Sequence, residues 1–137
     1  MGLTTESKVF DTNILIYHLN DALGDDAEQL LKKAFESGSY ISVRTRIEVL
    51  GWHKHSDESL SSAEELLSNL SEQPLSEEIV TLCIQLRQKF SLKVPDAIIA
   101  ATALHLKLPL ITRNINDFKK VPELKLVNPF EQVTSNE

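Results

Sequence analysis

The sequence predicts an α/β fold in which helices flank a central, mostly parallel sheet. Two observations support this prediction. Short apolar stretches of strand length alternate with longer stretches in which apolar residues recur at helical spacing, a pattern typical of parallel strands joined by right-handed crossovers. The length of 137 residues fits one domain over residues 1–137, with a core over about 8–130 and a polar C-terminal tail over 131–137.

Four expected elements make up the first part of the chain. They are a strand over residues 8–11, helices over 13–20 and 25–37, and a strand over 40–43. The acids Asp25 and Asp26 suit the positive N-terminal end of the second helix, and Gly38 closes it. Thr45 is the expected cap of a third helix that continues to about residue 55, because Glu48 follows it at the spacing of a capping box.

The second part continues the alternation. We expect a polar turn over 56–59, a helix over 60–70, a short strand or connector over 73–75, a helix from a Ser76 cap to about 91–93, a helix over 96–106, a strand over 110–112, a loop over 113–118, and an edge strand over 124–127. Pro95 suits the first turn of a helix. The helix that follows Pro95 is apolar nearly all round and rich in small residues, so it should lie centrally.

Composition and charge exclude several classes of protein. A net charge of −6 argues against binding nucleic acid through a broad basic surface, although an enzyme can still hold nucleic acid through bound metal. Cys83 is the only cysteine, so neither an intrachain disulfide nor a cysteine-rich zinc site is expected, and a cytoplasmic location fits. No apolar run is long enough to span a membrane, and residues 1–6 lack the pattern of a signal peptide.

Four carboxylates stand at the boundaries of expected elements: Asp11, Glu48, Asp96 and Asp117. Strand ends and the helix starts that follow them lie on one edge of a parallel sheet, so the four acids are expected to converge. Grouped carboxylates repel one another and need a cation, and hard oxygen ligands favour Mg²⁺ or Mn²⁺. Such a site positions a phosphodiester and activates a water molecule.

Each of these acids also has a purely structural interpretation. Asp11 can cap the first helix, Glu48 can complete the capping box of Thr45, and Asp96 can be an acid favoured by the helix dipole. Asp117 can be an ordinary turn residue. Only the joint pattern favours a site.

The acids and their neighbours form four blocks: FDTNILI (10–16), ISV with TRIEVLG (41–43 and 45–51), PDAIIAATA (95–103) and LITRNINDF (110–118). In this order they resemble the blocks of PIN domains, most closely VapC-like toxins of type II toxin–antitoxin modules, over about residues 8–130. The resemblance implies a PIN-like α/β/α sandwich and a ribonuclease dependent on Mg²⁺ or Mn²⁺. It also implies a homodimer in the cytoplasm, neutralised by a cognate antitoxin that covers the active site.

The resemblance also implies roles for single residues. Asp11, Glu48 and Asp96 match three acidic positions that hold metal and act in catalysis. The last block, with Thr112, Asn114 and Asp117, supplies the fourth acid. We assign it to Asp117 with Asn114 as a polar helper, although some relatives carry an acid at the position of Asn114.

Further residues beside the blocks are candidates for supporting roles. Thr12 and Asn13 are expected to orient Asp11 or to bind substrate. Arg46 and Arg113 either contact phosphate or form surface ion pairs. The chain shows no helix-turn-helix or basic arm, so any contact with DNA is expected only through the antitoxin.

Two other functions remain as alternatives. A catalytically inactive PIN fold could bind only RNA or a protein, although all four acids are present. Phosphoryl transfer on a doubly wound sheet is disfavoured, because aspartate-nucleophile phosphatases need a second acid where this chain has Asn13.

Overall fold

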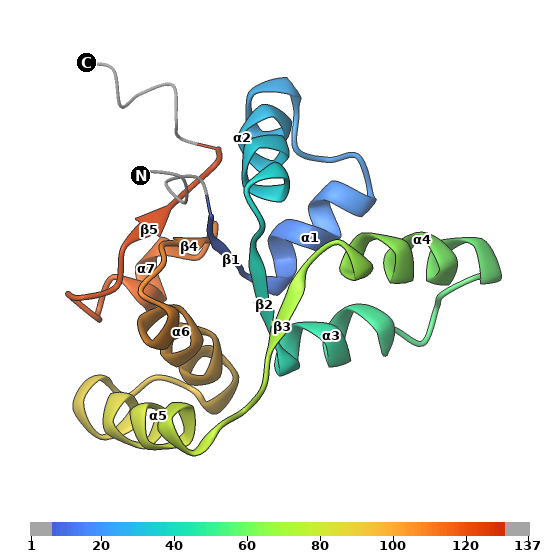
Figure 1. Cartoon of the computed structure of the whole chain (residues 1–137). Coiled ribbons are helices and arrows are strands. Elements are labelled where there is room, and N and C mark those ends of the chain that lie inside the picture. Colours follow the sequence, from blue (N-terminus) through green and yellow to red (C-terminus); the bar gives the residue numbers. More distant parts are fainter. Residues whose placement is uncertain (1–6, 131–137) are drawn as a thin grey trace.

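A computed structural model of the chain describes residues 7–130. The expectations for residues 1–6 and for the tail over 131–137 concern residues outside this part. Five short strands lie at the centre (Figure 1). They are β1 (Val9–Phe10), β2 (Tyr40–Ser42), β3 (Ser71–Gln73), β4 (Leu110–Ile111) and β5 (Leu126–Val127).

The sheet is parallel throughout, in the order β3-β2-β1-β4-β5. In the central strand, Val9 pairs with Tyr40 on one side and with Leu110 on the other. The prediction of a mostly parallel sheet is therefore confirmed, and β5 is an edge strand as expected. Because all strands run in one direction, the residues that follow β1 and β4 reach the same edge of the sheet.

Seven helices connect and cover the strands within the described residues. They are α1 (Thr12–Leu19), α2 (Asp25–Glu36), α3 (Val43–Leu50), α4 (Asp57–Ser68), α5 (Glu77–Phe90), α6 (Val94–Leu106) and α7 (Ile115–Phe118). Three of the predicted terminal features are present. The Ser76 side chain accepts from the Ile79 N–H, Pro95 lies in the first turn of α6, and Gly38 follows α2 with a positive φ.

Alternate residues of each central strand face two separate cores. Val9 and Leu110 pack with α5 and α6, whereas Phe10 and Ile111 pack with α1 to α4. Figure 1 shows α5 and α6 together on one side of the sheet. The predicted α/β/α layering is thus confirmed, and it follows from the period of two along a strand.

Helix α6 is the central helix that the sequence predicts. Six of its residues are buried, four of them alanines: Ala97, Ile99, Ala100, Ala101, Thr102 and Ala103. Small side chains allow the backbones of neighbouring elements to approach closely, and α6 packs against α5, α3 and β2. This packing holds the start of α6, where Asp96 lies, against the other acidic positions.

The expected start of the third helix was wrong. Ser42, at the end of β2, caps α3 by accepting from the Thr45 N–H at 3.2 Å, so α3 begins at Val43. Thr45 is buried inside the first turn and is not the cap. Thr45 and Glu48 have the spacing of a capping box. However, Ser42 lies three residues before Thr45, and its side chain accepts the hydrogen bond from the Thr45 N–H, so Ser42 is the cap.

Two further expectations need correction. The polar turn over 56–59 is the start of α4, where the side chains of Ser56 and Ser59 each accept from the other's backbone N–H. Serine thus takes the place that Glu or Gln usually holds in a capping box. Of the strand and the connector left open over residues 73–75, the structure has a strand, β3, but displaced to Ser71–Gln73. Its polar sequence carries no apolar alternation, and its backbone pairing with β2 defines it.

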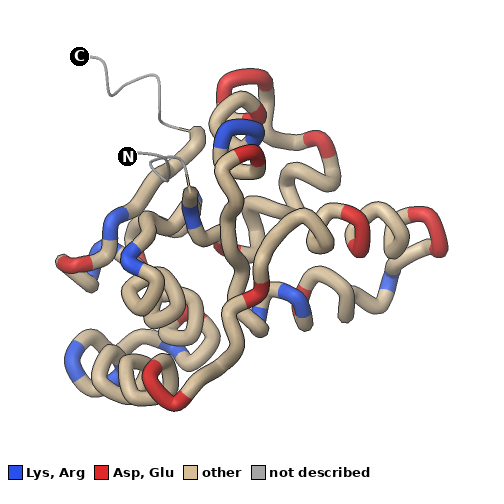
Figure 2. Tube along the Cα trace, viewed as in Figure 1, with Lys and Arg blue, Asp and Glu red and all other residues tan. Residues whose placement is uncertain are grey.

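Figure 2 shows that charged residues of both signs are distributed along the described part of the chain. Many of the acids stand in the first turns of α2, α4 and α5, where the helix dipole favours them. None of the helices among residues 7–130 is long and apolar enough to cross a membrane.

Candidate active site

Asp11 is the single residue between β1 and α1. It occupies the N-cap position, but its side chain makes no capping hydrogen bond. Instead its Oδ2 accepts from the hydroxyl of Thr112, the residue after β4, at 2.7 Å. The side chain is buried, and this burial raises the pKa of the Asp11 carboxyl. The contacts therefore differ from those of a helix cap and place a buried carboxylate at the edge of the sheet.

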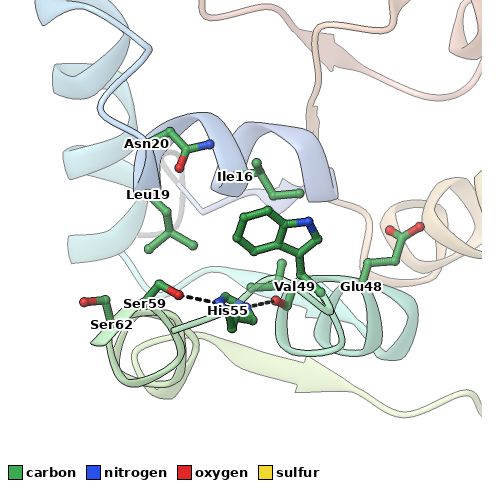
Figure 3. Close-up of a pocket in the computed structure, with 9 residues that line it drawn as sticks. Ile16, Leu19, Asn20, Glu48, Val49, His55, Ser59 and Ser62 are labelled. Carbon is green, nitrogen blue, oxygen red and sulfur yellow. Dashed lines mark hydrogen bonds between the residues drawn. The ribbon is translucent and has the colours of Figure 1, made fainter. Parts of the chain in front are cut away.

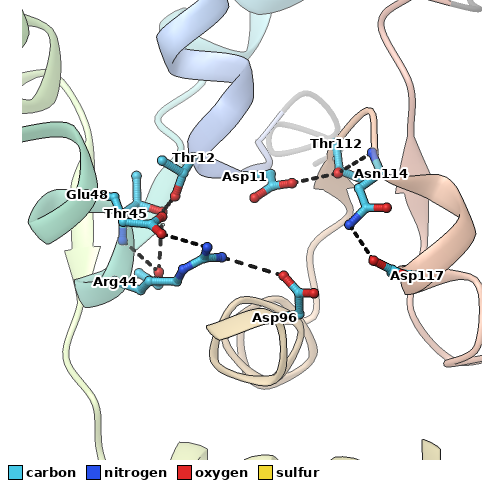
Figure 4. A network of polar contacts seen from close by, with 10 residues as sticks. Asp11, Thr12, Arg44, Thr45, Glu48, Asp96, Thr112, Asn114 and Asp117 are labelled. Carbon is cyan, nitrogen blue, oxygen red and sulfur yellow. Dashed lines mark hydrogen bonds and ion pairs between the residues drawn. The ribbon is translucent and has the colours of Figure 1, made fainter. Parts of the chain in front are cut away.

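Asp96 and Glu48 face each other across a guanidinium group (Figure 4). Nη2 of Arg44 donates to Oε2 of Glu48 at 2.7 Å, and Nη1 lies 3.6 Å from Oδ1 of Asp96. Burial raises the pKa of the Asp96 carboxyl, Arg44 lowers it, and the nearby acids Asp117 and Glu48 raise it further. These charge interactions mean that the carboxylates lie within electrostatic reach of one another.

Asp117 reaches the site from the short helix α7. Its Oδ2 accepts from the side-chain amide of Asn114 at 3.1 Å. The Asn114 backbone N–H in turn donates to the Thr112 hydroxyl at 2.9 Å, and Thr112 donates to Asp11. A continuous chain of hydrogen bonds therefore joins Asp117 to Asp11 (Figure 4).

The structure thus brings Asp11, Glu48, Asp96 and Asp117 together at one edge of the sheet. Thr12 also lies there, and its hydroxyl shares a 3.0 Å hydrogen bond with that of Thr45, which joins α1 to α3. Asn13 is exposed and lines a shallow pocket with Asp11, Tyr17, Arg113 and Asn114. The hydrogen bonds in this region position the acids; the acids themselves are free of close contacts with one another.

The two arginines expected beside the site differ in their surroundings. Arg46 forms an ion pair with Glu72 of β3, which is the alternative that the sequence left open. Arg113 is exposed, its guanidinium lies 4.5 Å from the ring centre of Phe130, and Nη1 donates to the Tyr17 hydroxyl at 3.3 Å. Arg113 therefore stands at the mouth of the site, with an aromatic surface beside it.

Arg44 is the site residue that the sequence reasoning missed. The sequence does indicate its pairing with Glu48, because Arg44 precedes Glu48 by four residues and so lies on the same face of the helix. The pairing with Asp96 carries no such signal, since it joins two different helices.

The donor set fits a hard divalent cation. All four acids offer carboxylate oxygens, the ligands that Mg²⁺ and Mn²⁺ prefer. Oε1 of Glu48 is buried without a hydrogen-bond partner among the described residues, so this oxygen has capacity for a ligand. Among residues 7–130, no three side chains of Asp, Glu, His or Cys lie close enough together to form a metal site as they stand. The guanidinium of Arg44 lies between two of the acids, Glu48 and Asp96.

A largely apolar pocket of about 320 Å³ adjoins the site (Figure 3). Glu48 lies at its wall, and α1, α3 and α4 supply residues that include Ile16, Val49 and Ser59. Trp52 also lines it and is half exposed. His55 is fixed there by hydrogen bonds of 2.8 Å to the Ser59 hydroxyl and to the Val49 carbonyl oxygen.

Fold and site together define a parallel α/β/α protein with four carboxylates at the carboxyl edge of its sheet. The sequence model of the PIN domain matches residues 8–124. The chain therefore belongs to the PIN domain family, and the resemblance found in the sequence is confirmed.

Individual relatives agree with this assignment. A chain of a toxin–antitoxin complex from Klebsiella pneumoniae is 36% identical, with 90% of this chain and 98% of that chain covered and a TM-score of 0.72. A chain of VapBC2 from Rickettsia felis, solved bound to a DNA fragment from their promoter, is 25% identical, with 88% and 97% covered and a TM-score of 0.78.

One curated relative matches over a shorter segment. A stretch of 41 residues is 39% identical to Ribonuclease VapC of Rickettsia bellii (strain RML369-C). The match covers 30% of this chain and 31% of that protein, so it spans about a third of the relative's length.

Proposed function

We propose that this chain is a VapC-like endoribonuclease that depends on Mg²⁺ or Mn²⁺ and forms the toxin of a type II toxin–antitoxin pair. The observation that carries the proposal is the meeting of Asp11, Glu48, Asp96 and Asp117 at one edge of a PIN fold. Both the Klebsiella and Rickettsia felis relatives come from toxin–antitoxin assemblies. The reaction is hydrolysis of an RNA phosphodiester.

The four acids and their hydrogen-bond partners would have different roles in this reaction. Asp11 and Asp96 would hold the metal ion, and Glu48 and Asp117 would complete its surroundings directly or through water. When bound, the divalent ion supplies a water of lowered pKa and stabilises the charge that develops on the phosphate. Thr112 and Asn114 keep the carboxylates of Asp11 and Asp117 in place through the hydrogen bonds described above.

Substrate is positioned at the mouth of the site. Arg113 has no acidic partner among the described ion pairs and lines the shallow pocket beside Asp11. A guanidinium is well suited to bind phosphate oxygens. Asn13, exposed in the same pocket, is a second candidate for contact with RNA.

The antitoxin would cover the site from the side of the apolar pocket. This pocket is lined mainly by apolar surface and lies directly beside Glu48, so an apolar side chain of the antitoxin can enter it while a neighbouring segment shields the acids. DNA binding would come through the antitoxin. From the family resemblance we also expect a homodimer that acts in the cytoplasm.

The decisive experiment compares the wild type with Asp96→Asn on a labelled pool of structured RNA such as tRNA. We expect cleavage with Mg²⁺ or Mn²⁺, none with a chelator, and a rate lower by about a hundredfold or more in the variant, because the metal's charge stabilisation contributes several kcal/mol. Glu123→Gln, an exposed acid at the opposite edge of the sheet, is the matched control.

The outcomes separate the competing functions. Equal cleavage by the wild type and Asp96→Asn would mean that the activity comes from elsewhere. If neither cleaves, calorimetric titration with Mn²⁺ decides. A binding site lost in Asp96→Asn supports the nuclease with a narrow substrate range, whereas no metal binding favours the inactive PIN fold that binds only RNA or protein.

Replacing Arg113 with alanine is expected to lower kcat/KM for RNA by about fivefold to tenfold, mainly through KM, since an exposed charge contact is worth about 1 kcal/mol. Steady-state cleavage of one labelled RNA measures this. Lys33→Ala removes an equal charge from the last turn of α2, at the opposite edge of the sheet, and should change little. A kcat/KM equal to that of the wild type would remove Arg113 from the substrate path.

A further inference from the structure

Arg44 contacts two of the four acidic side chains. Its guanidinium pairs with Glu48 within α3 and with Asp96 of α6, and Figure 4 shows it between them. Its charge also lowers the pKa of Asp11 and of Asp96, both of which burial raises. A positive charge therefore already stands among the carboxylates, where it reduces their mutual repulsion.

The guanidinium of Arg44 does not satisfy every polar atom around it. Nε of Arg44 and Oε1 of Glu48 are both buried, and neither has a hydrogen-bond partner among the described residues. Buried polar atoms without partners destabilise an arrangement, and a ligand that satisfies them is favoured. The pair with Asp96 is also loose, at 3.6 Å. Arg44 thus offsets part of the negative charge of the site, and buried polar atoms there remain without partners among the described residues.

We propose that Arg44 is an internal counter-cation that holds the metal-free site together and must leave Glu48 and Asp96 when a divalent cation binds there. The inference rests on the proposed metal site and goes beyond it, because it assigns to this chain's own arginine the control of metal affinity. The side chain is long, flexible and partly exposed, so the guanidinium can withdraw from the two acids.

The consequence is a competition between two cations for the same oxygens. A metal ion that binds Glu48 and Asp96 must first break the 2.7 Å and 3.6 Å contacts of Arg44. Removing the positive charge should therefore strengthen metal binding. At the same time, the metal-free protein should lose stability, since its carboxylates would then face one another without a counter-charge.

Arg44→Gln tests this by isothermal calorimetry with Mn²⁺ alone and by thermal melting with and without Mn²⁺. We expect Mn²⁺ to bind the variant about tenfold more tightly than the wild type, as expected when an opposing ion pair worth about 1.4 kcal/mol is removed. We also expect a lower Tm in chelator and a larger rise in Tm on adding Mn²⁺. Arg44→Lys, which keeps the charge, should stay close to the wild type.

Arg46→Gln is the matched control, because Arg46 lies two residues along the same helix and pairs with Glu72 instead. Mn²⁺ affinity that is equal or weaker in Arg44→Gln than in Arg46→Gln, with both variants folded by circular dichroism, would overturn the role of Arg44 and leave the metal site standing. No Mn²⁺ binding by the wild type or by either variant would instead overturn the proposed metal site, and the inference would fall with it.

Discussion

Asp11→Asn is expected to lower RNA cleavage by about a hundredfold or more while making the metal-free protein more resistant to heat. The loss of activity follows because an amide is a weaker ligand for a divalent cation than a carboxylate and brings no charge to the site. The gain in stability follows from burial, which disfavours the charged carboxylate of Asp11. The side-chain oxygen of asparagine can still accept from Thr112, so the local hydrogen bond is kept.

The stability effect has a defined dependence on pH. Burial raises the pKa of Asp11 above its ordinary value of 3.8, so between the two pKa values the folded protein binds more protons than the unfolded one. The free energy of unfolding therefore falls as the pH rises through this interval, and the loss is complete above the folded pKa. In chelator, the Tm advantage of Asp11→Asn should be full above the raised pKa of the folded state and vanish below the ordinary pKa.

Melting curves measured across pH in chelator check the predicted gain in stability, and cleavage assays at neutral pH check the predicted loss of activity. Glu123→Gln, whose side chain is exposed, should show neither effect. A variant that melts below the wild type at pH 7 would show that the Asp11 carboxylate stabilises the fold. Unchanged cleavage would remove Asp11 from the site.

Phe10→Ala is expected to lower the free energy of unfolding by about 3 to 5 kcal/mol, the usual cost of removing a fully buried aromatic ring. Phe10 ends the central strand β1, is fully buried, and its ring stacks on Phe35 of α2 at 5.2 Å between ring centres. The cavity would open directly beside Asp11, in the core that holds α1 to α4.

Urea unfolding measures this loss, with Phe130→Ala as the control of the same residue type. Phe130 is 37% exposed, so its loss should amount to about 1 kcal/mol. If Phe10→Ala is unfolded without denaturant, Phe10→Leu leaves a smaller cavity and still reports the effect. A smaller loss for the Phe10 variants than for Phe130→Ala would contradict the packing of the core.

Local sequence patterns predicted those features of the elements that depend only on neighbouring residues. The Ser76 cap, Pro95 at the start of a helix and Gly38 after α2 each act within a single turn, and each is found as expected. Where two nearby residues both suit the same role, the sequence does not show which of them takes it. Ser42 and Thr45 both suit a helix cap, and Ser42 prevails because β2 ends there and brings its side chain to the Thr45 amide.

The polar strand β3 shows another limit of local patterns. It lies at the edge of the sheet and is held by backbone pairing to β2, so its side chains need not alternate. The start of α4 is similar, since the reciprocal bonds of Ser56 and Ser59 form a helix start from residues that suit a turn equally well.

By itself, the sequence predicted the fold class, because hydrophobic periodicity sets strand and helix. It also predicted that the four acids would converge, because a parallel sheet brings its strand ends to one edge. Only the tertiary structure decided how those acids are held. The bond from Thr112 to Asp11 spans 101 positions of the chain, and the pairing of Arg44 with Asp96 joins two helices. Such contacts depend on the register and rotation of packed elements, which residue spacing within one element does not determine.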